Sequence, residues 1–229
     1  MNDLNVNLEN VNSRIARACK KAGRRAEDIR ILAVSKRQAS SRIRELRANG
    51  QKAFGENYVQ EAVLKQRDLT DLEIEWHFIG PLQSNKTALV ARHFQWVQSV
   101  DRANVLQRLS SQKPENLPDL NICLQVNIDR EQQKSGALPE EIPGLAQLAT
   151  NMRGLRLRGL MAIPRAAASE GEALQSFTNM YRLFQQLQAE GMKLDTLSMG
   201  MSADLEQAVL AGSTMVRVGT DLFGPRTPA

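Results

Sequence analysis

The chain has little of what several large protein classes require. Of its 229 residues only 4% are aromatic, two are cysteine (Cys19, Cys123) and two are histidine (His77, His93). Two cysteines cannot form a disulfide framework, and these four residues lack the spacing of a zinc site, so we expect no metal. No apolar run approaches the roughly 18 residues of a membrane span. The first residues are acidic rather than apolar, unlike a secretory signal. We therefore expect a cytoplasmic protein without membrane attachment.

The charge balance is mildly basic. Thirty Lys and Arg residues face 25 Asp and Glu residues, and the excess gathers at helical spacing at Arg14, Arg17, Lys20, Lys21, Arg24 and Arg25. A basic helical face can contact the phosphate backbone of a nucleic acid. The simpler interpretation is a solvated helix whose basic last turn is favoured by the helix dipole. Because no aromatic residue interleaves with the run, we expect no nucleic-acid partner.

Short apolar segments alternate with helical stretches along the chain. Eight segments are typical of buried strands: 31–34, 53–55, 75–79, 96–100, 120–128, 156–163, 196–199 and 215–218. Helical patterns occupy 41–48, 58–69, 85–93, 102–110, 141–152, 170–190 and 203–211. Eight βα units predict an α/β fold, a (β/α)8 TIM barrel. An open doubly wound sheet is the alternative, but no glycine-rich dinucleotide motif follows any strand.

The barrel accounts for nearly the whole chain. Leu4–Ala22 has apolar residues at helical spacing and Gly23 at its end, so residues 1–23 form an added N-terminal helix. Residues 225–229 form a loose tail. We therefore expect a single domain over residues 1–229.

Active sites in such barrels lie at the C-terminal ends of the strands, where the βα-loops begin. Lys36 ends the first apolar strand, and a lysine that enters a cavity there is partly desolvated and nucleophilic. Such an amine forms Schiff bases with carbonyl compounds, including pyridoxal 5'-phosphate (PLP). The alternative is a strand-end lysine that reaches solvent.

Small residues follow the last two strands. Ser202, Gly219 and Thr220 are placed to form a phosphate cup, because loops after strands seven and eight of such barrels often bind phosphate. Taken singly, Ser202 suits the N-cap of a helix over 203–211, and Gly219 suits a tight turn. Met201 fits a packing role, with possible contact to a bound ring. His77, within a strand, fits a structural role.

Seven separated blocks of the sequence occur together, in the same order, in one known family. They are Leu32-Ala33-Val34-Ser35-Lys36, Phe54-Gly55-Glu56-Asn57-Tyr58-Val59-Gln60-Glu61, the run from Trp76 to Lys86, Lys134-Ser135-Gly136, Arg158-Gly159-Leu160-Met161-Ala162-Ile163-Pro164, Leu197-Ser198-Met199-Gly200-Met201-Ser202 and Val216-Arg217-Val218-Gly219-Thr220. The chain resembles the YggS/PROSC family of PLP homeostasis proteins.

This resemblance implies a fold-type III PLP-binding barrel like the N-terminal domain of alanine racemase. It implies a Schiff base between PLP and Lys36, with Asn57 beside the cofactor ring. By the same resemblance, Ser202, Gly219 and Thr220 hold the phosphate and Arg217 faces the pyridine nitrogen.

Arg217 bears on whether the protein is an enzyme. A guanidinium only donates hydrogen bonds and stays charged, so a ring nitrogen that faces it stays unprotonated and is a poor electron sink. Racemases of this fold add a second base from another domain or subunit, whereas this chain has only two tyrosines, Tyr58 and Tyr181. We expect a monomeric PLP carrier that serves vitamin B6 homeostasis and supplies PLP-dependent apo-enzymes. An amino-acid racemase is the alternative.

The sequence departs from the family pattern beside the lysine. Members often continue Thr-Lys-Pro, whereas Arg37-Gln38-Ala39 stand here and alter the rim of the cofactor site. Lys134 follows the long fifth strand. It suits a secondary cofactor or effector contact, or a surface loop in which Gly136 sets a turn.

Overall fold

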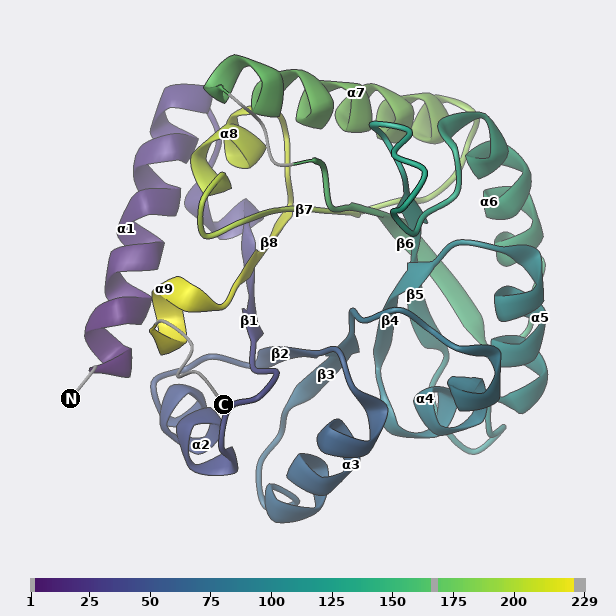
Figure 1. Ribbon diagram of the computed structural model, residues 1–229, viewed down its shortest axis with the longest axis horizontal. Coiled ribbons are helices and arrows are strands. Elements are labelled where there is room, and N and C mark those ends of the chain that lie inside the picture. Colours follow the sequence, from purple (N-terminus) through teal and green to yellow (C-terminus); the bar gives the residue numbers. More distant parts are fainter. Residues whose placement is uncertain (1–2, 166–168, 225–229) are drawn as a thin grey trace.

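Eight parallel strands form a closed barrel in the computed structural model, which describes residues 3–165 and 169–224. Each strand pairs with the next along the chain, and the last pairs with the first (Figure 1). The strands are β1 (Arg30–Val34), β2 (Ala53–Glu56), β3 (Glu75–Phe78), β4 (Trp96–Val100), β5 (Leu120–Val126), β6 (Leu155–Ala162), β7 (Thr196–Met201) and β8 (Met215–Val218). The predicted (β/α)8 TIM barrel is confirmed.

Helices surround the barrel in Figure 1. They are α1 (Leu4–Ala22), α2 (Ser40–Ala48), α3 (Val59–Asp68), α4 (Thr87–His93), α5 (Ala103–Gln112), α6 (Ile142–Thr150), α7 (Glu170–Ala189), α8 (Leu205–Leu210) and α9 (Thr220–Phe223). Short 3-10 turns occupy Ala26–Asp28, Ser84–Lys86 and Pro139–Glu141. The tail predicted at 225–229 lies outside the described residues.

The predicted N-terminal helix is confirmed as α1. Its N-cap is Asp3, whose carboxylate accepts hydrogen bonds from the amides of Asn5 and Val6, and Gly23 ends it in the left-handed region at φ 65°. Its apolar face lies against α8 and α9, and Figure 1 shows the three helices side by side. The helix therefore covers the part of the barrel that carries the last two strands.

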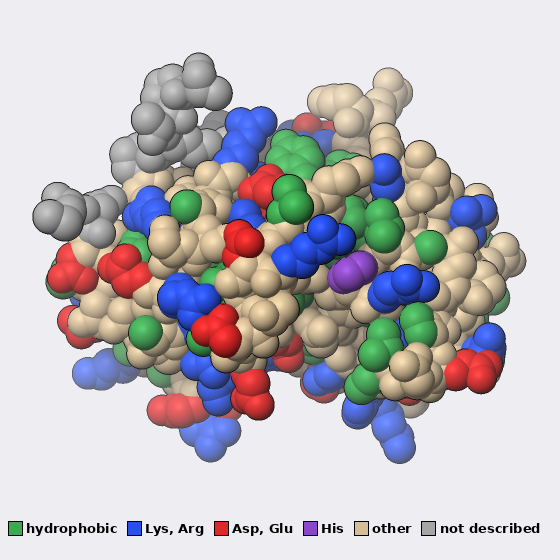
Figure 2. All heavy atoms as spheres, turned by 90° about the horizontal axis from the view of Figure 1, so that it is seen from below, with side chains coloured by type: hydrophobic (Ala, Val, Ile, Leu, Met, Phe, Trp, Pro, Cys, Tyr) green, Lys and Arg blue, Asp and Glu red, His purple; other side chains and the backbone are tan. Residues whose placement is uncertain are grey.

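The basic run on α1 differs in part from the expected solvated face. Arg14 turns toward the barrel and forms ion pairs with Glu206 and Asp221, and Arg24 donates to the carbonyl of Val209. The neighbouring Arg17 is exposed. On the face shown in Figure 2, basic and acidic side chains are interspersed rather than gathered by sign.

Two features at the end of the chain correct the expectations. The helix predicted over 203–211 begins only at Leu205, with Asp204 at its N-cap, so Ser202 does not cap it. The Ser202 hydroxyl instead accepts from the amide of Asp221, in α9. The sequence does not predict α9, because four residues are too few for a periodic pattern.

Burial on both faces explains why the strands are recognisable in the sequence. One set of side chains packs between the barrel and its helices and forms the large apolar core. The other set points into the barrel, where a small apolar cluster of Leu32, Ala53 and Met215 accompanies buried polar side chains. Within the residues that the structure describes, every helix is too short or too polar to span a lipid bilayer.

Candidate cofactor site

A cavity of about 260 Å³ opens where β1, β7 and β8 end. It is lined by Val34, Lys36, Gln38, Met201, Ser202, Ala203, Arg217, Gly219, Thr220 and Gly224. Six of the seven residues predicted to contact a cofactor therefore meet at one place, although 181 positions separate Lys36 from Arg217. A parallel barrel achieves this because all its strands end on the same side.

Lys36 lies in the turn that follows β1, and both of its neighbours are held from outside the barrel. Ser35 is buried, donates its hydroxyl to Glu56 Oε1 at 2.6 Å, and accepts from Lys65 Nζ at its carbonyl at 2.7 Å. Arg37 has a left-handed φ of 60° and donates its amide to Glu61. The backbone on each side of the lysine is thereby fixed.

Arg217 points into the barrel beneath the cavity. Its guanidinium donates to the carbonyl and the hydroxyl of Ser198, at 2.7 and 2.9 Å, and to the carbonyl of Ala162 at 2.7 Å. All three acceptors are uncharged. Burial lowers the pKa of Arg217 to about 10, so the group remains charged at neutral pH. A buried cation whose hydrogen-bond acceptors among the described residues are all neutral favours a ligand that brings an acceptor.

The loops after β7 and β8 are joined through α1. Arg14 donates to the carbonyl of Ser202 at 2.9 Å, contacts both carboxylate oxygens of Glu206 at 2.7 Å, and pairs with Asp221. Ser202 directly follows β7, whereas Asp221 lies in α9, which begins two residues after the end of β8. A single guanidinium therefore fixes the spacing between Ser202 on one side and Gly219-Thr220 on the other.

Asn57 lies beside this cavity rather than in it. It lines a neighbouring cavity with Tyr58, Phe78 and Lys86, and its Oδ1 atom is shielded from solvent without a hydrogen-bond partner. Gly80 sets its position, because a Cβ at Gly80 would stand 2.2 Å from the Asn57 carbonyl oxygen. Met201 lies at the rim, 38% exposed, with its amide donated to Asp204.

The residues that depart from the family pattern lie at the cavity edge, whereas Lys134 lies elsewhere. Gln38 lines the cavity, while the guanidinium of Arg37 lies 5.9 Å from the centre of the Tyr58 ring. The departure from Thr-Lys-Pro thus replaces residues at the cavity edge. Lys134 lies in the loop after β5 and forms an ion pair with Glu131.

The sequence does not predict the role of Glu56 and Lys65, which hold the backbone beside Lys36. Glu56 is fully buried, and Lys65 on α3 binds its carboxylate at 2.8 Å. Burial raises the pKa of Glu56, although Lys65 partly offsets that effect. A charged residue inside β2, in the run Ala53-Phe54-Gly55-Glu56, is the pattern that could have indicated it, because a buried carboxylate requires a partner.

Comparison with known proteins shows the family of the chain. Residues 6–227 match the family described as the alanine racemase N-terminal domain. A pyridoxal phosphate homeostasis protein from Pseudomonas aeruginosa is 50% identical over 226 residues, which cover 99% of this chain and 97% of that protein. Its counterpart in Escherichia coli K12 is 48% identical over 99% of this chain and 98% of that protein.

Solved structures show the same fold. PipY from Synechococcus elongatus, whose structure has PLP bound, is 38% identical, covers 92% of this chain and 100% of its own, and superposes with a TM-score of 0.77. Alanine racemase from Clostridium difficile, at 15% identity and a TM-score of 0.78, shares the fold over 58% of its length. The chain belongs to the alanine racemase N-terminal domain family and, within it, to the pyridoxal phosphate homeostasis proteins.

Proposed function

We propose that this protein binds PLP in the cavity at the ends of β1, β7 and β8 and serves PLP homeostasis as a carrier. The observation that carries the proposal is the pairing of Lys36 and Arg217 on one cavity. An amine at one wall and a buried cation with only neutral partners at another match the aldehyde and the pyridine nitrogen of PLP.

The other groups fit the rest of the cofactor. Ser202 and Thr220 bring hydroxyls, and Gly219 brings a backbone without a side chain, to the side where the phosphate would lie. Asn57 would lie beside the ring and Met201 at the rim. The cavity of about 260 Å³ is near the lower end of small-molecule sites, roughly 300 Å³. When bound, PLP supplies an aldehyde that exchanges between amines, and this exchange allows loading and release.

The PLP-bound structure of PipY supports cofactor binding, and the names of the relatives support a homeostasis role more than an enzyme. The chain's own residues agree. Arg217 would face the pyridine nitrogen with donors only and leave it unprotonated, so bound PLP would be a poor electron sink unless a second base assisted. Tyr58 is 48% exposed and turned to Arg37, while Tyr181 packs against Gly212. We propose delivery to PLP-dependent apo-enzymes by a monomer, with Lys134 as a secondary contact outside the main cavity.

The test is chemical trapping of the lysine. Purified protein is loaded with PLP, freed of excess, reduced with borohydride and mapped by mass spectrometry, with Lys36→Ala and the cavity-remote Lys52→Ala treated alike. We expect a visible absorption band and a reduced adduct on Lys36 in wild type and Lys52→Ala, and neither in Lys36→Ala. An adduct at another lysine, or none, would refute the assignment. Exchange of an amino acid's α-hydrogen in D₂O that depends on Lys36 would favour a racemase.

A further inference from the structure

A chain of buried polar side chains crosses the interior of the barrel from one mouth to the other. It begins at Glu75 Oε1, 2.6 Å from His77 Nε2, and continues from His77 Nδ1 to Gln98 Nε2 at 2.9 Å. Gln98 Oε1 lies 2.6 Å from the Ser198 hydroxyl, which is 2.9 Å from Arg217. His77, Gln98 and Ser198 are fully buried. The chain thus ends at the cation proposed to face the pyridine nitrogen.

The two ends of this chain dictate where every proton lies. Arg217 can only donate, so Ser198 Oγ accepts from it, and the Ser198 hydroxyl donates to Gln98 Oε1. With its oxygen engaged, Gln98 turns its NH₂ group to His77 Nδ1, which must therefore be unprotonated. The proton of the imidazole is then on Nε2, donated to the carboxylate of Glu75.

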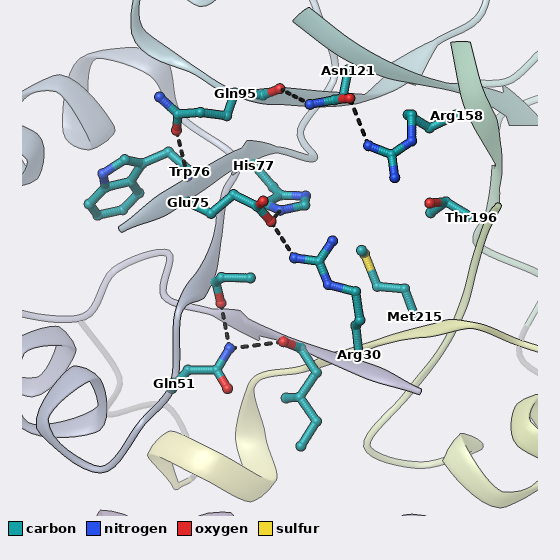
Figure 3. Close-up of polar contacts among 12 residues, drawn as sticks. Arg30, Gln51, Glu75, Trp76, His77, Gln95, Asn121, Arg158, Thr196 and Met215 are labelled. Carbon is teal, nitrogen blue, oxygen red and sulfur yellow. Dashed lines mark hydrogen bonds and ion pairs between the residues drawn. The ribbon is translucent and has the colours of Figure 1, made fainter. Parts of the chain in front are cut away.

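The surroundings favour this tautomer. Figure 3 shows His77 and Arg30 meeting at Glu75, at the mouth opposite the cavity. Trp96 stacks on the imidazole at 5.0 Å, and the guanidinium of Arg158 lies 4.7 Å from the centre of the Trp96 ring. Burial lowers the pKa of His77 although Glu75 opposes the effect, so the ring is neutral at neutral pH. The ring is held in place by contacts on its face and at both nitrogens.

We propose that His77 is a positioning residue for Arg217, acting through Gln98 and Ser198. Its Nδ1 lone pair fixes the Gln98 amide, which fixes the Ser198 proton and leaves Ser198 Oγ free to hold the guanidinium at the angle that PLP requires. The inference rests on the proposed function, because it concerns how Arg217 meets the ring. A protonated Nδ1 would face the Gln98 NH₂ with a second donor and break this order.

Two substitutions at one position separate this role from packing. An asparagine oxygen can stand where Nδ1 stands, so His77→Asn keeps an acceptor for Gln98. A glutamine amide reaches the place of Nε2, so His77→Gln keeps a hydrogen-bond donor for Glu75 and leaves the Gln98 NH₂ group without its acceptor. We expect His77→Gln to weaken PLP binding roughly 5- to 10-fold and to shift the absorption maximum of the bound cofactor. His77→Asn should stay within about twofold of wild type by the same hydrogen-bond reasoning.

A second variant keeps the test decisive if His77→Gln unfolds. Gln98→Met is similar in length and lacks the amide, and it should give the same loss and the same spectral shift. Because both changes break one chain, the double variant should bind no more weakly than the worse single one. Equal affinity and spectrum in His77→Asn and His77→Gln, or wild-type behaviour of Gln98→Met, would overturn the proposal. If wild type forms no adduct at Lys36, the proposed function itself fails.

Discussion

At the residue scale, one buried lysine holds the backbone around Lys36. Lys65 Nζ lies 2.7 Å from the Ser35 carbonyl, 2.8 Å from Glu56 and 2.6 Å from Glu61. Through these partners it fixes Ser35 directly and Arg37 by way of Glu61. Its side chain is 7% exposed and that of Glu56 is fully buried, so the pair between them is a buried ion pair, which is costly to break from one side.

Lys65→Met should therefore destabilise the protein far more than loss of a surface ion pair. It leaves the Glu56 carboxylate buried without its cation, at a cost of about 3 kcal/mol of unfolding free energy. The matched control is Arg44→Met, which breaks a solvent-exposed pair with Asp71 and should leave the free energy of unfolding almost unchanged. Urea unfolding of both variants measures the difference. Equal losses would show that the cluster is no more than a surface pair.

The burial of Lys65, unlike the position of Lys36, cannot be predicted from the sequence. Lys36 was predictable because it ends an apolar run, and strand ends of a barrel carry its chemistry. Lys65 lies on an amphipathic helix, where a lysine is ordinarily solvated. Lys65 is buried because the fold brings it to Glu56, and no local sequence pattern indicates that contact. The same reason hid His77 as a link to Arg217: the sequence predicted a structural histidine without its partners.

At the scale of elements, apolar strands were predictable and the short caps around the site were not. β5 and β8 are buried along almost their whole length, so their composition alone indicates them. α9 has four residues, and α8 begins after an Asp204 N-cap that makes no side-chain capping bond. Ser202 was therefore mistaken for the cap. The loops take their shape from Arg14 on α1, about 190 residues away in sequence.

Arg14 makes a prediction about the phosphate side of the cavity. Arg14→Met removes the hydrogen bonds to the Ser202 carbonyl and to the carboxylates of Glu206 and Asp221. The segments after β7 and β8 then lose the side chain that links them. We expect PLP to bind roughly 5- to 10-fold more weakly. Pyridoxal, which lacks the phosphate, should bind as it does to wild type. The control is Arg17→Met, the exposed neighbour on the same helix. Titrations that show equal weakening for both ligands would contradict a role at the phosphate.

At the scale of the whole molecule, the barrel interior contains a network of hydrogen bonds and is not a purely apolar core. The side facing the helices is apolar, and that packing gives the fold its stability. Inside, His77, Gln98, Ser198 and Arg217 lie in one connected line. Such a network stabilises only while each member finds its partner. Folding and cofactor geometry therefore depend on the same protonation state of His77.

This dependence predicts how stability changes with pH. Burial lowers the folded-state pKa of His77 below the ordinary 6.5, because its effect exceeds the opposing effect of Glu75. The unfolded chain then binds a proton that the folded protein does not. Unfolding free energy therefore falls as pH drops through about 6.5, by at most about 1.4 kcal/mol per pH unit, until the pH reaches the folded-state pKa. His77→Asn should lose that slope. The raised pKa of Glu56 acts in the opposite direction but is shared by both proteins and cancels in the comparison.

Urea unfolding of the cofactor-free protein between pH 7.5 and 5.5 (a range chosen to bracket the ordinary histidine pKa of about 6.5) measures the slope directly. His93→Asn is the control, because partial burial lowers the pKa of His93 as well and its contribution must be separated. We expect wild type and His93→Asn to weaken on acidification more steeply than His77→Asn. Parallel curves for wild type and His77→Asn would mean that His77 is protonated equally in the folded and unfolded states, and the proton order drawn through Gln98 to Arg217 would then be wrong.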